Sequence, residues 1–182
     1  MQRFVFWEDV RGNKLIGLEE NTLVIFSSDN GAESNYTYQR EDYHHYSCMN
    51  FKGGKRDIYE GGHRVPFLMR WPKVIERGRK VNIPVCQTDY LATIAEIIGV
   101  RLPDNGGEDS YSLYAGLKGG DFNKNIRGAV IHHSVSGHFS IREEKWKLNM
   151  LRGSGGSLKP RFVETKLGDA IYELYNLEED PG

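Results

Sequence analysis

The sequence has little cysteine: Cys48 and Cys86 are the only two among 182 residues. Two cysteines do not define a disulfide framework, so the cysteine content leaves the redox compartment open. No apolar run approaches the roughly 20 residues that a membrane-spanning helix needs. Residues 1–14 also lack the apolar core and the cleavage site of a secretory signal peptide. The sequence therefore predicts no membrane span.

Neither sign of charge predominates, because the formal net charge is −1. This balance gives no electrostatic reason to expect a nucleic-acid partner. The GxSxG nucleophile elbow, the GxxxxGK[ST] phosphate loop and the HExxH zinc motif are all absent, and the six histidines show no zinc-finger spacing. These absences exclude the commonest hydrolase and nucleotide-binding signatures.

Two short apolar runs and one helical pattern organise the first part of the chain. Residues 22–26 are apolar at consecutive positions, which favours a strand buried on both faces, as in a parallel sheet of an α/β domain. Residues 65–71 are a second apolar run and predict another strand. Residues 88–99 carry the apolar period of a helix that ends at Gly99. The polar residues 32–53 between the runs indicate a long irregular loop.

The pattern changes near residue 127. Residues 128–133, 139–142, 145–151 and 171–177 read as short strands joined by connections of hairpin length. We therefore expect an antiparallel sheet after a boundary within residues 118–126. The residues Gly153–Gly156 indicate a flexible glycine-serine loop.

Asp29-Asn30-Gly31 follows the first apolar run directly. Asn-Gly is the favoured pair of a type I′ hairpin turn, so a purely structural role is open. A carboxylate and an amide oxygen at the carboxyl end of a strand also suit Ca²⁺ or Mg²⁺, because ligands gather at this edge of α/β sheets. Both interpretations stand at this point.

Lys55 ends the glycine-rich sequence Gly53-Gly54-Lys55. It is either a solvated lysine on a turn or the cation of an anion pocket, in which glycines let backbone N–H groups approach the anion. Glu60 and Arg64 are spaced as an i, i+4 ion pair, for which we expect a structural role. His133, at the end of an expected strand, is either structural or a substrate contact.

The ordered series of motifs resembles the type I, formylglycine-dependent sulfatases, the arylsulfatase family. The resemblance rests on TLVIFSSDNG, GGKRDIYEGGHRVPFLMRWP, QTDYLATIAEIIGV, AVIHHSVSGHFSIREEKWKLNML and IYELYNLEEDPG, and it covers about residues 17–182. It implies the C-terminal portion of the family fold. That portion is α/β, with an alkaline-phosphatase-like sheet fragment (residues 1–120) and a small α+β C-terminal subdomain with an antiparallel sheet (residues 121–182).

The resemblance also implies a chemistry. The family hydrolyses sulfate esters of sugars or aryl groups with Ca²⁺ and a formylglycine nucleophile, and its members are usually periplasmic, secreted or lysosomal. By the match of motifs, Asp29 and Asn30 are expected metal ligands, and Lys55 is the expected catalytic and sulfate-binding cation. His133 is the expected substrate contact. Preplaced cations of this kind stabilise charge that develops on oxygen during group transfer.

The sequence departs from the family in one respect. It contains no CxPxR or SxPxR motif, from which the family makes formylglycine, and it lacks the upstream acidic ligands, lysine and histidines. We therefore expect a truncated sulfatase that is inactive alone and binds Ca²⁺ weakly. Two alternatives remain: a non-catalytic protein that binds anionic glycans through Lys55 and the C-terminal sheet, and a phosphate- or phosphonate-ester hydrolase of the same superfold.

Overall fold

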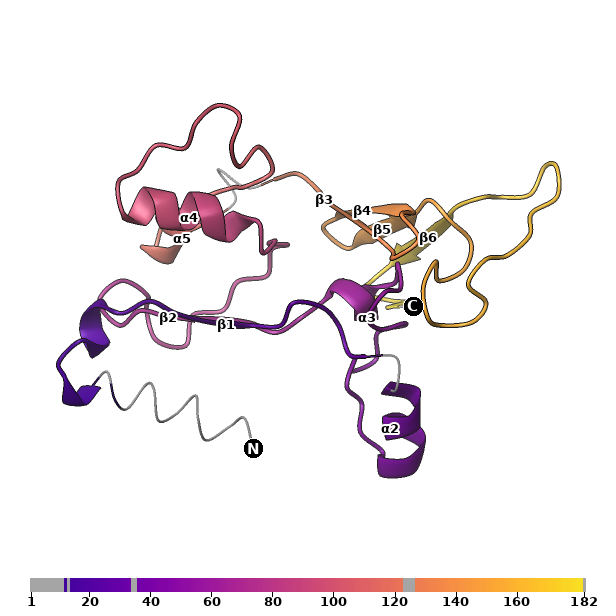
Figure 1. Cartoon of the computed structure of the whole chain (residues 1–182), viewed down its shortest axis with the longest axis horizontal. Coiled ribbons are helices and arrows are strands. Elements are labelled where there is room, and N and C mark those ends of the chain that lie inside the picture. The colour runs from indigo at the N-terminus through magenta and orange to yellow at the C-terminus, as the bar shows by residue number, and fades with distance from the viewer. Residues whose placement is uncertain (1–11, 13, 34–35, 123–126, 182) are drawn as a thin grey trace. The chain divides into compact units, whose positions relative to one another are not determined.

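The computed structural model describes residues 12, 14–33, 36–122 and 127–181. The chain forms two compact units (Figure 1). The first unit takes Met1–Ser27 and Phe67–Ile126, and the second takes Ser28–Pro66 and Arg127–Gly182. Residues 28–66 thus pack with the C-terminal sheet, whereas the division of the family fold at residue 120 stays a prediction.

The first unit contains a two-stranded sheet of β1 (Val24–Ser27) and β2 (Phe67–Arg70). The strands are antiparallel, with Val24 opposite Arg70, so the parallel sheet suggested by residues 22–26 is not what β1 forms with β2. Consecutive apolar residues report that both faces are apolar, but they carry no information about strand direction. Phe26 and Leu68 pair directly across the ladder and are both exposed.

The expected helix over 88–99 is confirmed as α4 (Asp89–Ile97). The Asp89 carboxylate is fully buried and accepts hydrogen bonds from the backbone N–H groups of Cys86 (2.7 Å) and Tyr111 (3.0 Å). Gly99 adopts a φ of +71° just beyond the helix, a left-handed conformation in which glycine is unstrained. Gly99 therefore follows the helix as expected, whereas no side-chain hydrogen bond caps the N-terminus, where Asp89 instead holds the flanking segments.

The apolar stripe of α4 is less buried than its period predicted. Ala95 is buried, whereas Leu91, Ile94 and Ile98 are exposed. The short segments η1 (Glu19–Asn21) and α5 (Tyr114–Leu117) complete the first unit. Within the described residues, this unit therefore presents apolar helix and strand faces to solvent.

The second unit begins with two helices. Within residues 32–53, where the sequence indicated an irregular loop, the structure has the helix α2 (Tyr36–Tyr43). That expectation is thus wrong in part, because a polar segment without an apolar period still forms backbone helix hydrogen bonds. The helix α3 (Glu60–His63) is one turn long, and its first three residues are buried.

The C-terminal strands form one antiparallel sheet, as expected. Its strands run in the order β3 (Val130–His133), β4 (Phe139–Glu143), β5 (Trp146–Asn149) and β6 (Glu173–Asn176). Each strand pairs with the next along the chain, which produces a meander. The orange and yellow strands of Figure 1 show this sheet.

The register gives the two faces of this sheet opposite characters. One cross-strand row is polar and buried or half-buried: His132, Ser140, Asn149 and Glu173. The neighbouring row, on the other face because side chains alternate along a strand, is aliphatic: Ile131, Ile141, Leu148 and Leu174. Ile131 and Leu174 are each 63% exposed. The sheet therefore buries its polar face and exposes its apolar face.

Among the residues that the structure describes, no helix is long and apolar enough to cross a bilayer.

Candidate functional site

All four residues that the sequence singled out lie in the second unit. Lys55 lies on a tight turn in which Gly53 and Arg56 have φ angles of +77° and +81°. The Lys55 backbone N–H donates to the carbonyl oxygen of Ala32 at 2.6 Å. This hydrogen bond brings the segment that follows Asp29 and Asn30 against the lysine turn.

Gly31 fixes the same segment on α3. Its N–H donates to the carbonyl oxygen of Gly62 at 2.9 Å, and a Cβ at this position would overlap the carbonyl oxygen of Gly61. Glycine is therefore required here by close backbone approach and not by a left-handed φ. Asp29, which is exposed, and Asn30, which is half-buried, precede this contact.

The Lys55 ammonium forms an ion pair with the Glu33 carboxylate at 3.3 Å, and Arg56 pairs with the same carboxylate. The backbone N–H groups of Gly54 and Lys55 are occupied by Asp57 and Ala32. The anion pocket expected from the glycines therefore does not use these two N–H groups. The side chains of Lys55 and Arg56 are half-exposed cations that an anion can reach.

Asp29 and Asn30 fit a hard cation in kind. The Asn30 side-chain N–H donates to the Gly31 carbonyl oxygen at 3.1 Å, which leaves the amide oxygen as a ligand. Within the described part of the chain, no group of three or more His, Cys, Asp or Glu residues has metal-binding geometry. Two oxygens fall well short of the roughly 6–8 that Ca²⁺ takes, so these residues fit only as part of a larger set of ligands.

His133 is the last residue of β3 and is exposed. Its Nδ1 lies 2.8 Å from the Ser134 carbonyl oxygen, and its ring contacts the Phe139 ring edge-on at 6.0 Å. Two residues later, the Val135 N–H donates to the Arg56 carbonyl oxygen at 3.0 Å. A backbone hydrogen bond thus joins the β3–β4 connection to the lysine turn.

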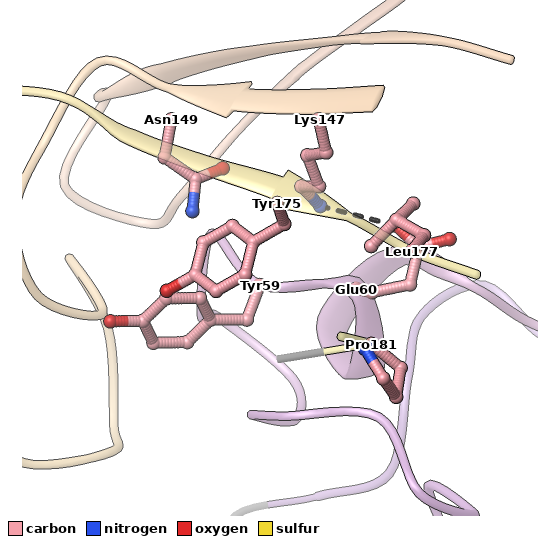
Figure 2. A pocket seen from close by; sticks show the side chains of 7 residues that line it. All are labelled: Tyr59, Glu60, Lys147, Asn149, Tyr175, Leu177 and Pro181. Carbon is pink, nitrogen blue, oxygen red and sulfur yellow. Dashed lines mark hydrogen bonds and ion pairs between the residues drawn. The ribbon is translucent and has the colours of Figure 1, made fainter. Parts of the chain in front are cut away.

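Glu60, on α3, is the buried centre of an ion cluster. Its carboxylate contacts Arg64 at 3.1 Å, Arg142 at 2.7 Å and Lys147 at 3.4 Å. The expected Glu60–Arg64 pair is therefore confirmed, while its partners on the sheet were not predicted. Figure 2 shows Lys147 extending from β5 to Glu60. Burial lowers the pKa of Lys147 to about 8, an effect that Glu60 opposes.

Two histidines stack beside this cluster. The rings of His63 and His132 lie 4.0 Å apart, and the Nε2 atoms of both are buried without a hydrogen-bond partner. Burial, followed by the charge of Lys147, lowers the pKa of His63 to about 3 and that of His132 to about 2. Both imidazoles are therefore neutral at physiological pH.

A tyrosine pair closes the other side of the cluster (Figure 2). Tyr59 and Tyr175 pack edge-to-face with centroids 6.1 Å apart, and Lys52 lies over the Tyr59 ring at 4.1 Å. Tyr175 donates to Glu173 at 2.9 Å. Burial raises the pKa of both phenols, so neither is a source of negative charge near pH 7.

The Gly153–Gly156 loop was expected to be flexible and is instead buried, so that expectation is wrong. It packs against Asp57, a fully buried carboxylate that the sequence analysis did not single out. The signal was present in the sequence: closely spaced glycines permit tight backbone approach as readily as they permit flexibility. Only the tertiary contacts distinguish the two cases.

Solved structures share this fold. A Bacteroides thetaiotaomicron protein, from work on the metabolism of multiple glycosaminoglycans, matches 98% of the chain with a TM-score of 0.77 and 26% identity. The PsFucS1 sulfatase from Pseudoalteromonas matches 96% with a TM-score of 0.72 and 27% identity. This chain covers 37% and 34% of those two chains. The expected α/β, alkaline-phosphatase-like fold class is confirmed by these neighbours.

Sequence comparison agrees. The family profile described as Sulfatase matches residues 13–100. A sulfatase of Formosa agariphila is 30% identical over 94% of the chain, and the N-acetylgalactosamine-6-O-sulfatase of Bacteroides thetaiotaomicron is 28% identical over 90%. Human steryl-sulfatase is 37% identical over 56% of the chain. The chain belongs to the sulfatase family. It spans 29%, 32% and 18% of these relatives, which fits the expectation that it corresponds to a portion of the family fold.

Proposed function

We propose that this chain contributes the sulfate-binding half of an active site that hydrolyses sulfate esters. The observation that carries the proposal is the hydrogen bond from the Lys55 N–H to the Ala32 carbonyl oxygen, which joins the Asp29-Asn30 segment to the lysine turn. This hydrogen bond supports the proposal because it holds the segment of the proposed oxygen ligands against the turn that carries the proposed cation. Lys55 binds a sulfate oxygen and neutralises charge that develops on the leaving oxygen.

Asp29 and Asn30 would hold a Ca²⁺ ion, which supplies positive charge for the sulfate oxygens when bound. The rest of the ligands and the formylglycine nucleophile belong, in this proposal, to the portion of the family fold beyond the region that this chain spans. The contribution of this chain is to orient the anion. It does so with Lys55. The substrate anion displaces Glu33 from Lys55 or shares the lysine with it.

For the substrate we propose a sulfated carbohydrate, with an aryl sulfate as the second class. N-acetylgalactosamine-6-O-sulfatase and an ulvan-active sulfatase are among the relatives with the broadest coverage of this chain, at 90% each. His133, exposed at the end of β3, is the proposed contact to the group that carries the sulfate.

The first test is catalytic. The purified 182-residue chain should not turn over 4-nitrophenyl sulfate, because it lacks the CxPxR or SxPxR nucleophile motif. Reading the flanking coding sequence should reveal such a motif in frame. Robust turnover by the purified chain, or unrelated flanking sequence, would overturn the proposed division of the site.

The second test concerns anion binding by Lys55. Titration of the chain with inorganic sulfate, followed by NMR, should perturb the Lys55 turn, and the effect should be lost in K55A. The matched control is K166A, which removes an exposed lysine of the same unit. A preference for phosphate over sulfate would favour a phosphate-ester hydrolase, and tight binding of a sulfated glycan by the chain alone would favour a non-catalytic glycan-binding protein.

A further inference from the structure

Asp57 is the most completely enclosed acidic group beside the lysine turn. Its exposed fraction is 0%. One carboxylate oxygen accepts the N–H of Gly54 at 2.9 Å, within the turn itself. The other accepts the N–H groups of Ser157 (2.5 Å) and Leu158 (3.0 Å), a hundred residues further along the chain. Both oxygens are therefore occupied by backbone donors, so Asp57 is not free to bind substrate or metal.

Hydrogen bonds from distant segments also hold the backbone around Asp57. The N–H of Ile58 donates to the Ser154 carbonyl oxygen at 2.8 Å. The carbonyl oxygen of Arg56 accepts from Val135 at 3.0 Å, and the carbonyl oxygen of Asp57 accepts a hydrogen bond from the His63 ring. The residue that links Lys55 to Asp57 is thus anchored to the β3–β4 connection as well.

This anchoring explains a strained residue. Arg56 has a φ of +81°, a region that side-chain-bearing residues rarely adopt and that persists only where the surroundings enforce it. The glycine loop makes the enforcement possible, because a Cβ on Gly156 would meet the Arg56 carbonyl oxygen and the Asp57 carboxylate. Only a bare backbone approaches the turn this closely.

We propose that Asp57 is a positioning residue, which clamps the Lys55 turn to the buried 153–158 loop and so fixes the direction of the Lys55 ammonium. This inference rests on the proposed function of Lys55 in sulfate binding. Asp57 acts through the backbone of the turn and does not touch the anion. A carboxylate is needed because three N–H donors converge on it, and charge-assisted hydrogen bonds are the stronger kind.

The experiment measures two properties of the intact chain: amide hydrogen exchange along residues 53–56, and the dissociation constant for inorganic sulfate. In D57N the side-chain NH₂ group meets a backbone N–H on one side, so at least one hydrogen bond to the clamp is lost. We expect the exchange of the Lys55 amide to accelerate at least tenfold and sulfate to bind about tenfold more weakly. D57E, which keeps the charge but lengthens the side chain, should displace the turn in the same way.

Asp89 supplies a matched control. It is also fully buried and also accepts backbone N–H groups from two separate segments, but it lies in the first unit. D89N should reduce stability without changing Lys55 exchange or sulfate binding. The amides of β5 report in every sample whether the sheet is intact.

Acceleration confined to the turn in D57N or D57E supports the inference. Unchanged Lys55 exchange in both variants overturns it, as does acceleration throughout the sheet in both, because Asp57 would then be a general element of the fold. If the wild-type chain fails to bind sulfate, the proposed role of Lys55 fails. The exchange data still decide whether Asp57 holds the turn.

Discussion

The ion-pair partners of Glu60 are mostly distant in the sequence. Glu60 is 3% exposed, and within the described residues its carboxylate contacts three cations: Arg64, Arg142 and Lys147. Its i, i+4 partner was predictable from spacing, but the two sheet cations lie more than 80 residues away. Long-range charge pairing of this kind depends on the strand register and not on local sequence.

We expect Glu60→Gln to destabilise the second unit by about 3–5 kcal/mol, because the buried Lys147 and the half-buried Arg142 would then lack their counter-charge. Urea unfolding followed by circular dichroism measures the loss. Glu33→Gln is the control: this partly exposed carboxylate also pairs with cations, and its removal should cost less than about 1 kcal/mol. Equal losses of stability in both variants would contradict the burial of Glu60.

The stacked histidines predict a pH dependence of stability. In the folded chain the pKa is lowered to about 3 for His63 and about 2 for His132. In the unfolded chain each titrates near 6.5, so between about pH 6.5 and 3 the unfolded state binds more protons. Stability is therefore expected to fall as pH drops below 6.5, by at most about 1.4 kcal/mol per pH unit for each histidine.

Urea midpoints measured between pH 7.5 and 4.5 test this dependence. The double variant H63Q/H132Q should show a flatter profile than the wild type over that range. H133Q, which changes an exposed histidine of the same strand, should keep the wild-type slope. A wild-type profile that is already flat would contradict the burial of the pair.

At the scale of elements, the contact between the Asp29-Asn30-Gly31 segment and α3 determines whether the site forms. Gly31 is the sensitive position, because a Cβ there would overlap the Gly61 carbonyl oxygen. We expect Gly31→Ala to separate this segment from α3 and to break the hydrogen bond between Gly31 and Gly62. The loss should reach several kcal/mol, the range of overpacking and lost hydrogen bonds combined.

Hydrogen exchange at the Gly31 and Lys55 amides reports this separation directly. Gly128→Ala is the matched substitution, because a Cβ on Gly128 meets nothing within 4 Å. It should leave both amides and the unfolding midpoint nearly unchanged. Similar behaviour of the two alanine variants would show that the close backbone approach at Gly31 does not contribute to the free energy of unfolding.

At the scale of the whole molecule, both units expose apolar faces within the described residues. In the second unit this is the row across β3–β6, from Ile131 to Leu174. Contiguous apolar patches on a soluble protein mark surfaces that other groups cover or that promote association. The solved relatives are about three times as long as this chain, which covers 37% and 34% of two of them.

We expect the chain to bind the apolar dye 8-anilinonaphthalene-1-sulfonate in its folded state, because the aliphatic row is accessible. Leu174→Asn should reduce the fluorescence enhancement several-fold, since it removes apolar surface from the row without changing the charge that the anionic dye meets. Leu167→Asn makes the same change at an exposed leucine outside the row and is the control. Dye binding unaffected by Leu174→Asn would show that this face is not the binding surface.

The sequence by itself determined several of the local elements and the family, although it did not indicate α2. The helix Asp89–Ile97 with Gly99 beyond it, and the four C-terminal strands, follow from periodicity and end signals, which act over a few residues. The motifs around Asp29 and Lys55 were sufficient to recognise a sulfatase. These features depend on neighbours in the chain, so one sequence contains them in full.

The tertiary structure alone decided the rest. Strand direction in β1–β2, the burial of Gly153–Gly156 and the three-donor environment of Asp57 all depend on segments tens of residues apart. The local sequence around a glycine run or a buried aspartate does not identify the distant segment that it contacts. Which face of the C-terminal sheet is buried follows from what packs on it, and here that is the polar face, beside the ion cluster of Glu60.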